Sequence, residues 1–245
     1  MMHIRLVMLL IALFTCAGAQ AQFANSSLPI EMEADSTGAD ANTGKVTFTN
    51  IAIRQGPLSI RADRAESSAL GFDNSTWTFR GNVTLDAPQS NLSASQMTLR
   101  FREKRLESAE FAGSPLRYAD KLDSDTRVTA RRADVRFTRN AVASVELSGA
   151  PIELSRAADE DGQRTEGKAD AISYDASTSD LRLTGNAELG EGANRITGNQ
   201  ITYNLISRQV TAAADEQGDR KVHITINPST GDTTITSDQD DSGTE

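Results

Sequence analysis

The chain has 245 residues, with 25 Lys and Arg against 34 Asp and Glu, a formal net charge of −9. An acidic chain lacks the basic surface that general nucleic-acid binding requires, so no nucleic-acid partner is expected. One cysteine, Cys16, and two histidines, His3 and His223, are too few for a recognisable metal site or catalytic triad, so we expect no metal, no cofactor and no enzyme.

The first predicted element is a cleaved secretory signal at residues 1–21. Arg5 precedes an apolar run from Leu6 to Phe14 that is too short to span a bilayer as a helix. Two small-x-small cleavage sites follow this run, and the pattern is typical of a signal peptide. The mature chain is therefore expected to be exported. Since Cys16 leaves with the signal, no disulfide is expected.

Strand patterns begin in residues 44–66, which read GKVTFTNIAIRQGPLSIRADRAE. Apolar residues stand on even positions up to Phe48, on odd positions at Ile51 and Ile53, and on even positions again from Leu58. Strict alternation is typical of a half-buried strand, and a one-residue slip moves the apolar set to the other face. We expect about sixteen short strands, because no long stretch has helical spacing with caps.

A repeat with a period near 36 residues explains the slips. Its copies begin at five glycines: Gly44, Gly81, Gly113, Gly149 and Gly185. Downstream of each glycine a small residue recurs, and the alternation often changes phase just past it: Ala62, Ala94, Ala130, Gly167 and Gly198. Small residues allow the bulge or corner that such a change needs, and a fixed period indicates stacked supersecondary units. Each change is expected to mark a strand that crosses from one sheet to a facing one.

One all-β domain is therefore expected over residues 22–227, built as an open two-sheet structure from repeated short antiparallel strands. The polar, acidic tail at 228–245 is expected to be disordered. Apolar residues should line the two inner faces: Ile30, Met32, Phe48, Ile60, Leu99, Phe101, Phe137, Leu154, Tyr174, Leu183 and Tyr203. Such a stripe forms either an ordinary sandwich core or the wall of a groove that admits alkyl chains, and both interpretations stay open.

Five motifs occur in order between residues 28 and 226: PI-x-x-x-AD, G-x-V-T-F-T, Q-G-x-L-x-I-x-AD, L-T-G-N-A and I-x-G-x-x-I-x-Y. With them the chain resembles the LptA/OstA-like family of periplasmic lipopolysaccharide-export proteins. Two features depart from the family pattern. Asn50 follows Thr49 directly, where the family more often has a glycine first, and the region from 68 to 145 is longer than in short members.

The resemblance implies a twisted, open two-sheet β-jelly roll with a lipid-binding groove and no catalysis. It implies a periplasmic protein that binds the lipid A acyl chains of lipopolysaccharide and carries it from the inner to the outer membrane within a trans-periplasmic bridge. The implied partners are an inner-membrane LptC-like protein with its ABC transporter and an outer-membrane LptD-like barrel. Matching motifs place Ile30, Leu154, Tyr174 and Ala176 at groove-lining positions. A membrane-anchored LptC-like member and a non-enzymatic structural β-repeat protein are the alternatives.

Two segments are candidate sheet edges, Leu28–Ala34 and Lys221–Asn227. Both alternate cleanly and carry little charge, so each is a template for a further strand and predicts a head-to-tail homo-oligomer. About sixteen strands over two sheets, at about 4.8 Å per strand, predict a groove roughly 40 Å long.

The span from 100 to 139 is basic in this acidic chain, with 11 basic and 7 acidic residues. Arg100, Arg102, Arg131 and Arg132 are candidates for contacts to lipopolysaccharide phosphates. They alternate with apolar residues, which also fits the solvated outer face of strands.

Overall fold

The computed structural model describes residues 28–120, 125–139, 141–158, 163–207, 209–214 and 221–226. The predicted signal and the predicted acidic tail lie outside these residues. All elements among them are β-strands, which confirms the all-β prediction. The strands are β1 (Glu31–Glu33), β2 (Ser36–Asp40), β3 (Lys45–Gln55), β4 (Leu58–Ser67), β5 (Thr76–Asp86), β6 (Ser90–Arg102), β7 (Arg105–Asp120), β8 (Arg127–Thr138), β9 (Ala141–Arg156), β10 (Thr165–Asp175), β11 (Asp180–Glu191), β12 (Asn194–Asn204), β13 (Val210–Ala213) and β14 (His223–Thr225).

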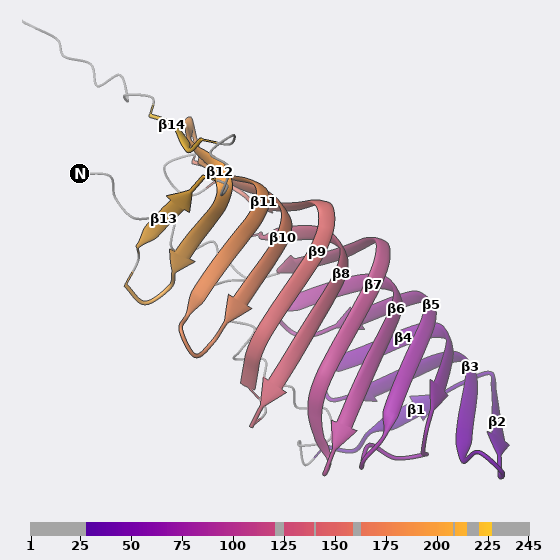
Figure 1. The fold of residues 1–245 in the computed structure, drawn as a ribbon. Helices are drawn as coiled ribbons and strands as arrows, with labels where there is room; N and C mark the ends of the chain where they lie inside the picture. Colours follow the sequence, from indigo (N-terminus) through magenta and orange to yellow (C-terminus); the bar gives the residue numbers. More distant parts are fainter. Residues whose placement is uncertain are drawn as a thin grey trace, which may run out of the picture.

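Each strand from β3 to β12 pairs antiparallel with the next one along the chain, so successive hairpins build one long sheet (Figure 1). Antiparallel neighbours need only short turns, which the Gly-, Asn- and Asp-rich connections supply. The ends of the sheet are divided. At one end β1 and β2 pair with different parts of β3, and at the other β13 and β14 pair with different parts of β12.

The sheet folds onto itself because its strands are irregular near their middles. In the β10–β11 pair, for example, the register shifts between Lys168 and Ala171. Such a bulge bends and twists a strand. Two layers result, a first layer from β1 to β14 and a second layer from β2 to β13, and both share β3 to β12 (Figure 1). The architecture is an open, twisted β-jelly roll, and the predicted crossings between facing sheets are confirmed.

The strand count and the length of the molecule differ from the predictions. The described residues form 14 strands rather than about sixteen. The number is smaller because each long strand from β3 to β12 passes through both layers without a break. Each layer therefore contains twelve strand segments, since ten strands are shared and two short ones are added at the ends. Twelve segments are separated by eleven spacings of about 4.8 Å, which give an interior roughly 50 Å long, more than the roughly 40 Å predicted.

The small residues of the repeat lie on the inner side of the bend. There each pairs across strands with an apolar neighbour, in the pairs Ile51–Ala62, Val83–Ala94, Leu116–Ala130, Ile152–Ala169 and Ala187–Gly198. In the first four a large side chain faces a small one, because close-packed layers leave room for one large group. The fourth repeat position was assigned wrongly. Ala169 occupies it, whereas Gly167 pairs with Leu154 farther from the bend.

Three bends carry the same side-chain contact, in which the amide of an asparagine donates a hydrogen bond to an aspartate. The pairs are Asp35–Asn50 (2.6 Å), Asp63–Asn82 (3.0 Å) and Asp170–Asn186 (2.8 Å). Each asparagine has a positive φ, between 44° and 50°, a conformation that asparagine tolerates better than most residues. These contacts explain the aspartates of the two AD motifs and the asparagine of L-T-G-N-A.

Gly81 supplies a test of this bend. Its φ is +74°, and a Cβ added there would lie 2.3 Å from Oδ2 of Asp63. We expect Gly81→Ala to lower the free energy of unfolding by about 1–3 kcal/mol, because both the backbone and the Asp63–Asn82 contact become strained. Urea denaturation measures this loss. Gly71→Ala is the control and should be nearly neutral, since the nearest atom to its added Cβ lies 4.0 Å away. Equal effects of the two changes would contradict the account.

Candidate functional site

Two rows of inward-facing residues run the length of the interior. In the first layer one row crosses all twelve segments in register: Met32, Ile53, Ile60, Leu85, Leu92, Tyr118, Val128, Leu154, Gly167, Leu189, Ile196 and Ile224. We call it the edge-to-edge row. A second row faces it from the second layer: Phe48, Ala65, Phe79, Met97, Phe111, Ala133, Leu147, Ile172, Leu183, Ile201 and Ala212. No charged residue interrupts either row, so the interior is an apolar track from one edge to the other.

The residues predicted to line the groove differ in their exposure. Seven are buried: Phe48, Ile60, Leu99, Phe101, Leu154, Leu183 and Tyr203. Four are half-buried: Ile30, Phe137, Tyr174 and Ala176. Met32 pairs with Ile53 on the inner face but is 40% exposed, because β1 is an edge strand. The structure therefore gathers most of this set in one core and leaves Met32 at its rim.

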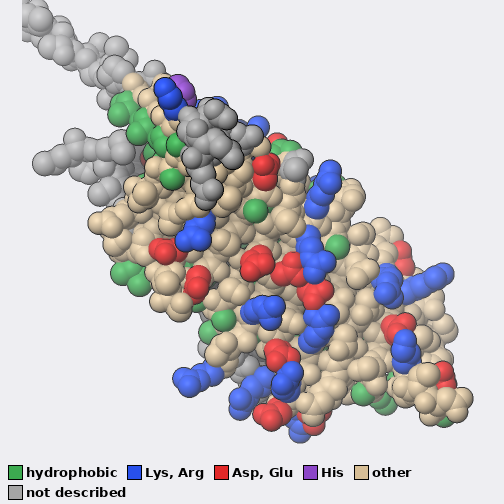
Figure 2. Space-filling view, in the orientation of Figure 1, with side chains coloured by type: hydrophobic (Ala, Val, Ile, Leu, Met, Phe, Trp, Pro, Cys, Tyr) green, Lys and Arg blue, Asp and Glu red, His purple; other side chains and the backbone are tan. Residues whose placement is uncertain are grey.

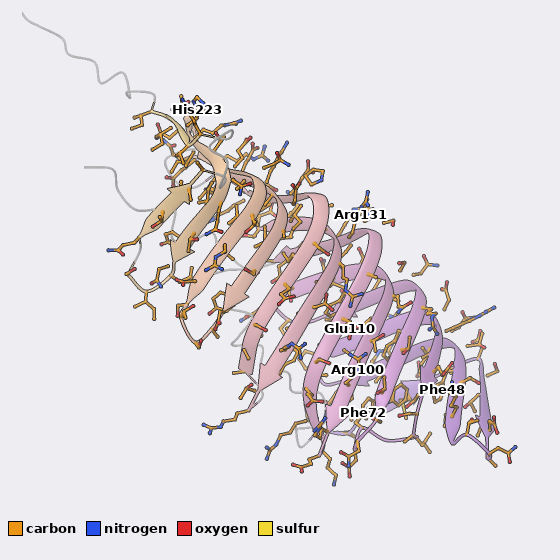
Figure 3. The ribbon with its side chains drawn as sticks, viewed as in Figure 1. Phe48, Phe72, Arg100, Glu110, Arg131 and His223 are labelled. Carbon is orange, nitrogen blue, oxygen red and sulfur yellow. The ribbon has the colours of Figure 1, made fainter. Side chains whose placement is uncertain are left out.

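Aromatic side chains fill the interior at the end that contains β3 to β6. Trp77 is fully buried and stacks on Phe72 (ring centroids 4.9 Å apart), Phe48 (5.7 Å) and Phe79 (6.0 Å). Phe72 comes from the β4–β5 loop, and Phe101 meets its ring edge-on at 5.1 Å. Phe48 and Phe72 lie toward this end of the molecule, and His223 lies at the other (Figure 3). The sequence analysis missed Trp77 and Phe79, although both follow the alternation of residues 76–86.

Half-buried apolar residues occur along the whole track, including its part beyond the aromatic end. From β8 onward several inward residues are half-buried: Val135, Phe137, Val145, Leu147, Tyr174, Ile196 and Leu205. Partial burial raises the pKa of the Tyr174 phenol, with a further contribution from Asp175.

A pocket of about 420 Å³ opens at the aromatic end. Leu28 and Ile30 line one side, and Phe72 and Lys104 belong to hairpin connections of the second layer. Gln55 donates a hydrogen bond from Nε2 to the carbonyl of Leu28 at 3.0 Å, which fixes the segment before β1 against the first layer. The pocket thus brings apolar side chains next to one cationic group, Lys104, and one carboxylate, Asp73.

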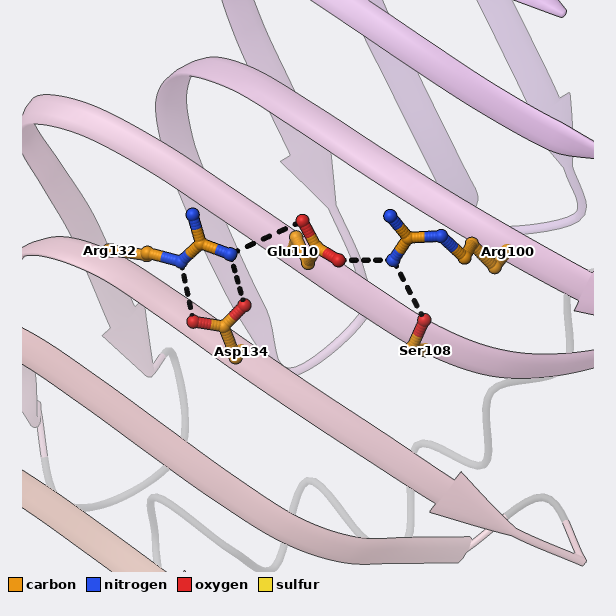
Figure 4. Close-up of polar contacts among 5 residues, drawn as sticks. All are labelled: Arg100, Ser108, Glu110, Arg132 and Asp134. Atoms are coloured by element: carbon orange, nitrogen blue, oxygen red, sulfur yellow. Dashed lines mark hydrogen bonds and ion pairs between the residues drawn. The ribbon is translucent and has the colours of Figure 1, made fainter.

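The outer face carries interspersed charges of both signs (Figure 2). Arg100 and Arg132 both contact Glu110, and Arg132 also binds Asp134, with 2.6 Å from Nε to Oδ2 (Figure 4). The bond to Asp134 raises the pKa of Arg132. Arg102 pairs with Glu107 at 3.3 Å. Of the arginines offered for phosphate contacts, Arg100 and Arg132 are thus held by carboxylates on the outer face.

Among the described residues, no three His, Cys, Asp or Glu side chains come together as a metal site requires. The described part of the chain also contains no helix that is long and apolar enough to cross a membrane.

Comparison with known families decides what kind of protein this is. Residues 64–209 match the model of the LptA/(LptD N-terminal domain) LPS transport protein family, more than half of the chain. The chain belongs to this family. The prediction of an LptA/OstA-like protein is confirmed, and lipopolysaccharide transport, a non-enzymatic role, is the function that describes the family.

No curated protein sequence matches the chain. Among solved structures, it is similar to LptH, described as the LptA homologous periplasmic component of the lipopolysaccharide transport device from Pseudomonas aeruginosa. The two chains are 15% identical with a TM-score of 0.35, and the match covers 84% of this chain and 99% of LptH.

Proposed function

We propose that this LptA-like protein carries lipopolysaccharide across the periplasm with its acyl chains between the two layers. The observation that carries the proposal is the edge-to-edge row, which is apolar across all twelve segments and ends at the exposed side chains of Met32 and Ile224. Each buried methylene is worth about 0.8 kcal/mol, so acyl chains need a continuous apolar path to leave a membrane. The track supplies this path, and no chemical step is required.

The direction and the partners follow from the family resemblance. The ligand moves from the inner membrane, where an LptC-like protein and an ABC transporter supply it, to an LptD-like barrel in the outer membrane. The family match, the predicted signal at 1–21 and the periplasmic relative LptH support a periplasmic location. A mature chain that still begins at Met1 would favour the anchored LptC-like alternative.

Photo-crosslinking in cells tests the proposal with neighbouring residues as controls. A photoreactive residue at Tyr174 or Phe137, which face the interior, should label with lipopolysaccharide. The same residue at Ser173, which precedes Tyr174 on β10, should label far less because successive strand residues face opposite sides. Equal labelling at inner and outer positions would contradict transport between the layers and would favour the structural-repeat alternative.

A further inference from the structure

Two hairpins at the border of the second layer, β6–β7 and β8–β9, carry clustered basic residues. The β6–β7 turn contributes Arg102, Lys104 and Arg105, and the end of β8 contributes Arg136 and Arg139. We call these five residues the basic rim. They belong to neighbouring strands, since β7 pairs with β8 and Ser108 lies opposite Arg136. Several Lys and Arg side chains lie at this lower border of the molecule, with Asp and Glu side chains among them (Figure 2), below β6 to β9 in Figure 1.

Most residues of the basic rim form no ion pair with a described acidic residue. All five residues are exposed. Arg102 pairs with Glu107, but Lys104, Arg105, Arg136 and Arg139 form no ion pair with any described residue. This contrasts with Arg100 and Arg132 on the adjacent outer face, which carboxylates hold in place. Four cations without an ion pair to any described residue therefore project from two adjacent hairpins, with Glu103 as the acidic residue of the β6–β7 turn.

The backbone of these turns points to a role other than stability. Glu103, Lys104 and Arg139 have φ values of 50°, 62° and 52°. Long side chains rarely adopt this conformation, and a two-residue turn with two positive φ values strongly prefers Asn-Gly. Other connections meet the same demand with glycine, as at Gly44 and Gly192. Strain of this kind collects at functional sites.

The pocket at the aromatic end joins the basic rim to the apolar interior. Lys104 lines this pocket together with the apolar Leu28, Ile30 and Phe72 and the acidic Asp73. The backbone N–H of Glu103 also donates to Oδ1 of Asn74 at 3.1 Å, so the turn is fixed against the loop that carries Phe72. A cationic group therefore lies where apolar surface becomes accessible, which suits a ligand with aliphatic chains and an anionic headgroup.

We propose that the basic rim binds the phosphate groups of the lipopolysaccharide headgroup while the acyl chains occupy the interior. This inference rests on the proposed function. Arginine forms paired, charge-assisted hydrogen bonds to phosphate, and lysine adds a compact cationic donor. The rim thereby fixes the headgroup outside the apolar track and holds it in one orientation.

Binding of lipid A with its phosphates, and of lipid A from which they have been removed, tests the proposal on the mature protein. The triple variant Lys104→Gln/Arg105→Gln/Arg139→Gln should bind phosphorylated lipid A roughly 10- to 100-fold more weakly, because hydrogen bonds between charged groups are lost. Its affinity for the dephosphorylated lipid should equal that of the wild type. The matched control Lys168→Gln/Arg182→Gln/Arg195→Gln removes three positive charges from β10 to β12 and should bind both lipids normally.

Several outcomes would overturn the proposal, and they are distinguishable. Unchanged affinity of the triple variant for phosphorylated lipid A removes the rim from recognition but leaves transport intact. Failure of the wild type to bind either lipid contradicts the proposed function itself. If the triple variant loses only its binding to phosphatidylglycerol vesicles, the rim contacts a membrane surface instead. Lys104→Gly separates binding from folding: it should raise the melting temperature while it weakens binding, whereas a purely structural turn would leave affinity unchanged.

Discussion

Replacing Trp77 with alanine is expected to lower the free energy of unfolding by about 3–5 kcal/mol, the largest loss from any single truncation of the core. Trp77 is fully buried and stacks on rings from β3, β5 and the β4–β5 loop. Its removal leaves a cavity that the neighbouring rings cannot fill, because both layers are fixed by backbone pairing around it. Single domains are typically stable by about 5–15 kcal/mol, so the loss is a large share of the total.

Urea denaturation followed by far-ultraviolet circular dichroism measures this effect, since the variant lacks the chain's one tryptophan. Trp77→Phe keeps an aromatic ring but loses the hydrogen bond from Nε1 to the carbonyl of Gly71 (3.1 Å), so its loss should be smaller. Leu70→Ala, in the same loop and 64% exposed, is the control and should change stability by less than about 0.5 kcal/mol. A Trp77→Ala variant that unfolds at the wild-type midpoint would show that the aromatic end is not a stabilising core.

The local pattern of the sequence predicted the layers of this fold but not the continuity of its strands. Alternation and its slips depend on neighbouring residues alone, so the bends near Ala62, Ala94 and Ala130 could be located before the structure was known. Whether two short strands are one bent strand depends on hydrogen bonds to neighbouring strands, which a single sequence does not display. The estimates of sixteen strands and of a shorter interior follow from that gap.

Ambiguity within one repeat caused the error at Gly167. The fourth copy has two small residues, Gly167 and Ala169, two positions apart, so both face the interior. Alternation cannot choose between them. Cross-strand register does, because Ala169 pairs with Ile152 at the bend whereas Gly167 pairs with Leu154.

The two interpretations of the arginines stayed open in the sequence for a similar reason. The carboxylate that binds Arg100 is Glu110 on β7, and the same group binds Arg132 on β8. These contacts bring together residues 10 and 22 positions apart in the chain. The basic composition of the span was visible, but which of its cations remain unpaired depends on the register of three strands.

The edges of the sheet match the segments that the sequence offered for assembly. β1 and β14 are the outermost strands of the first layer. Most of the exposed large apolar side chains among the described residues belong to the first or last strands and their flanks, including Leu28 and Met32 at one end and Ile206, Val210, Ile224 and Ile226 at the other. An interior roughly 50 Å long is short for a path between two membranes, so a head-to-tail chain of copies is the assembly that we propose. In such a chain Ile224 of one copy would lie beside Met32 of the next and extend the edge-to-edge row.

Charges placed at the two edges test this assembly and its polarity. Ile224→Lys blocks the β14 edge and Met32→Lys blocks the β1 edge, and both side chains are already exposed, so folding should be unaffected. A head-to-tail joint needs one edge of each kind, so either variant alone should stay monomeric at concentrations where the wild type forms longer chains. In an equal mixture, the free β1 edge of the Ile224→Lys variant can still pair with the free β14 edge of the Met32→Lys variant. The mixture should therefore form a dimer that grows no further.

Light scattering coupled to size-exclusion chromatography distinguishes the possible results. Dimers of Ile224→Lys alone would mean that β1 pairs with β1 in a symmetric joint, which ends growth at two copies. Variants that each assemble like the wild type would place the joint at β2 and β13 in the second layer, because those are the remaining edges among the described residues. A wild type that is monomeric at every concentration would exclude the chain of copies and leave docking of a single copy between its membrane partners. The capped dimer is therefore the result that the edge-to-edge row requires, since a symmetric joint would place Met32 beside Met32 and leave both Ile224 ends unjoined.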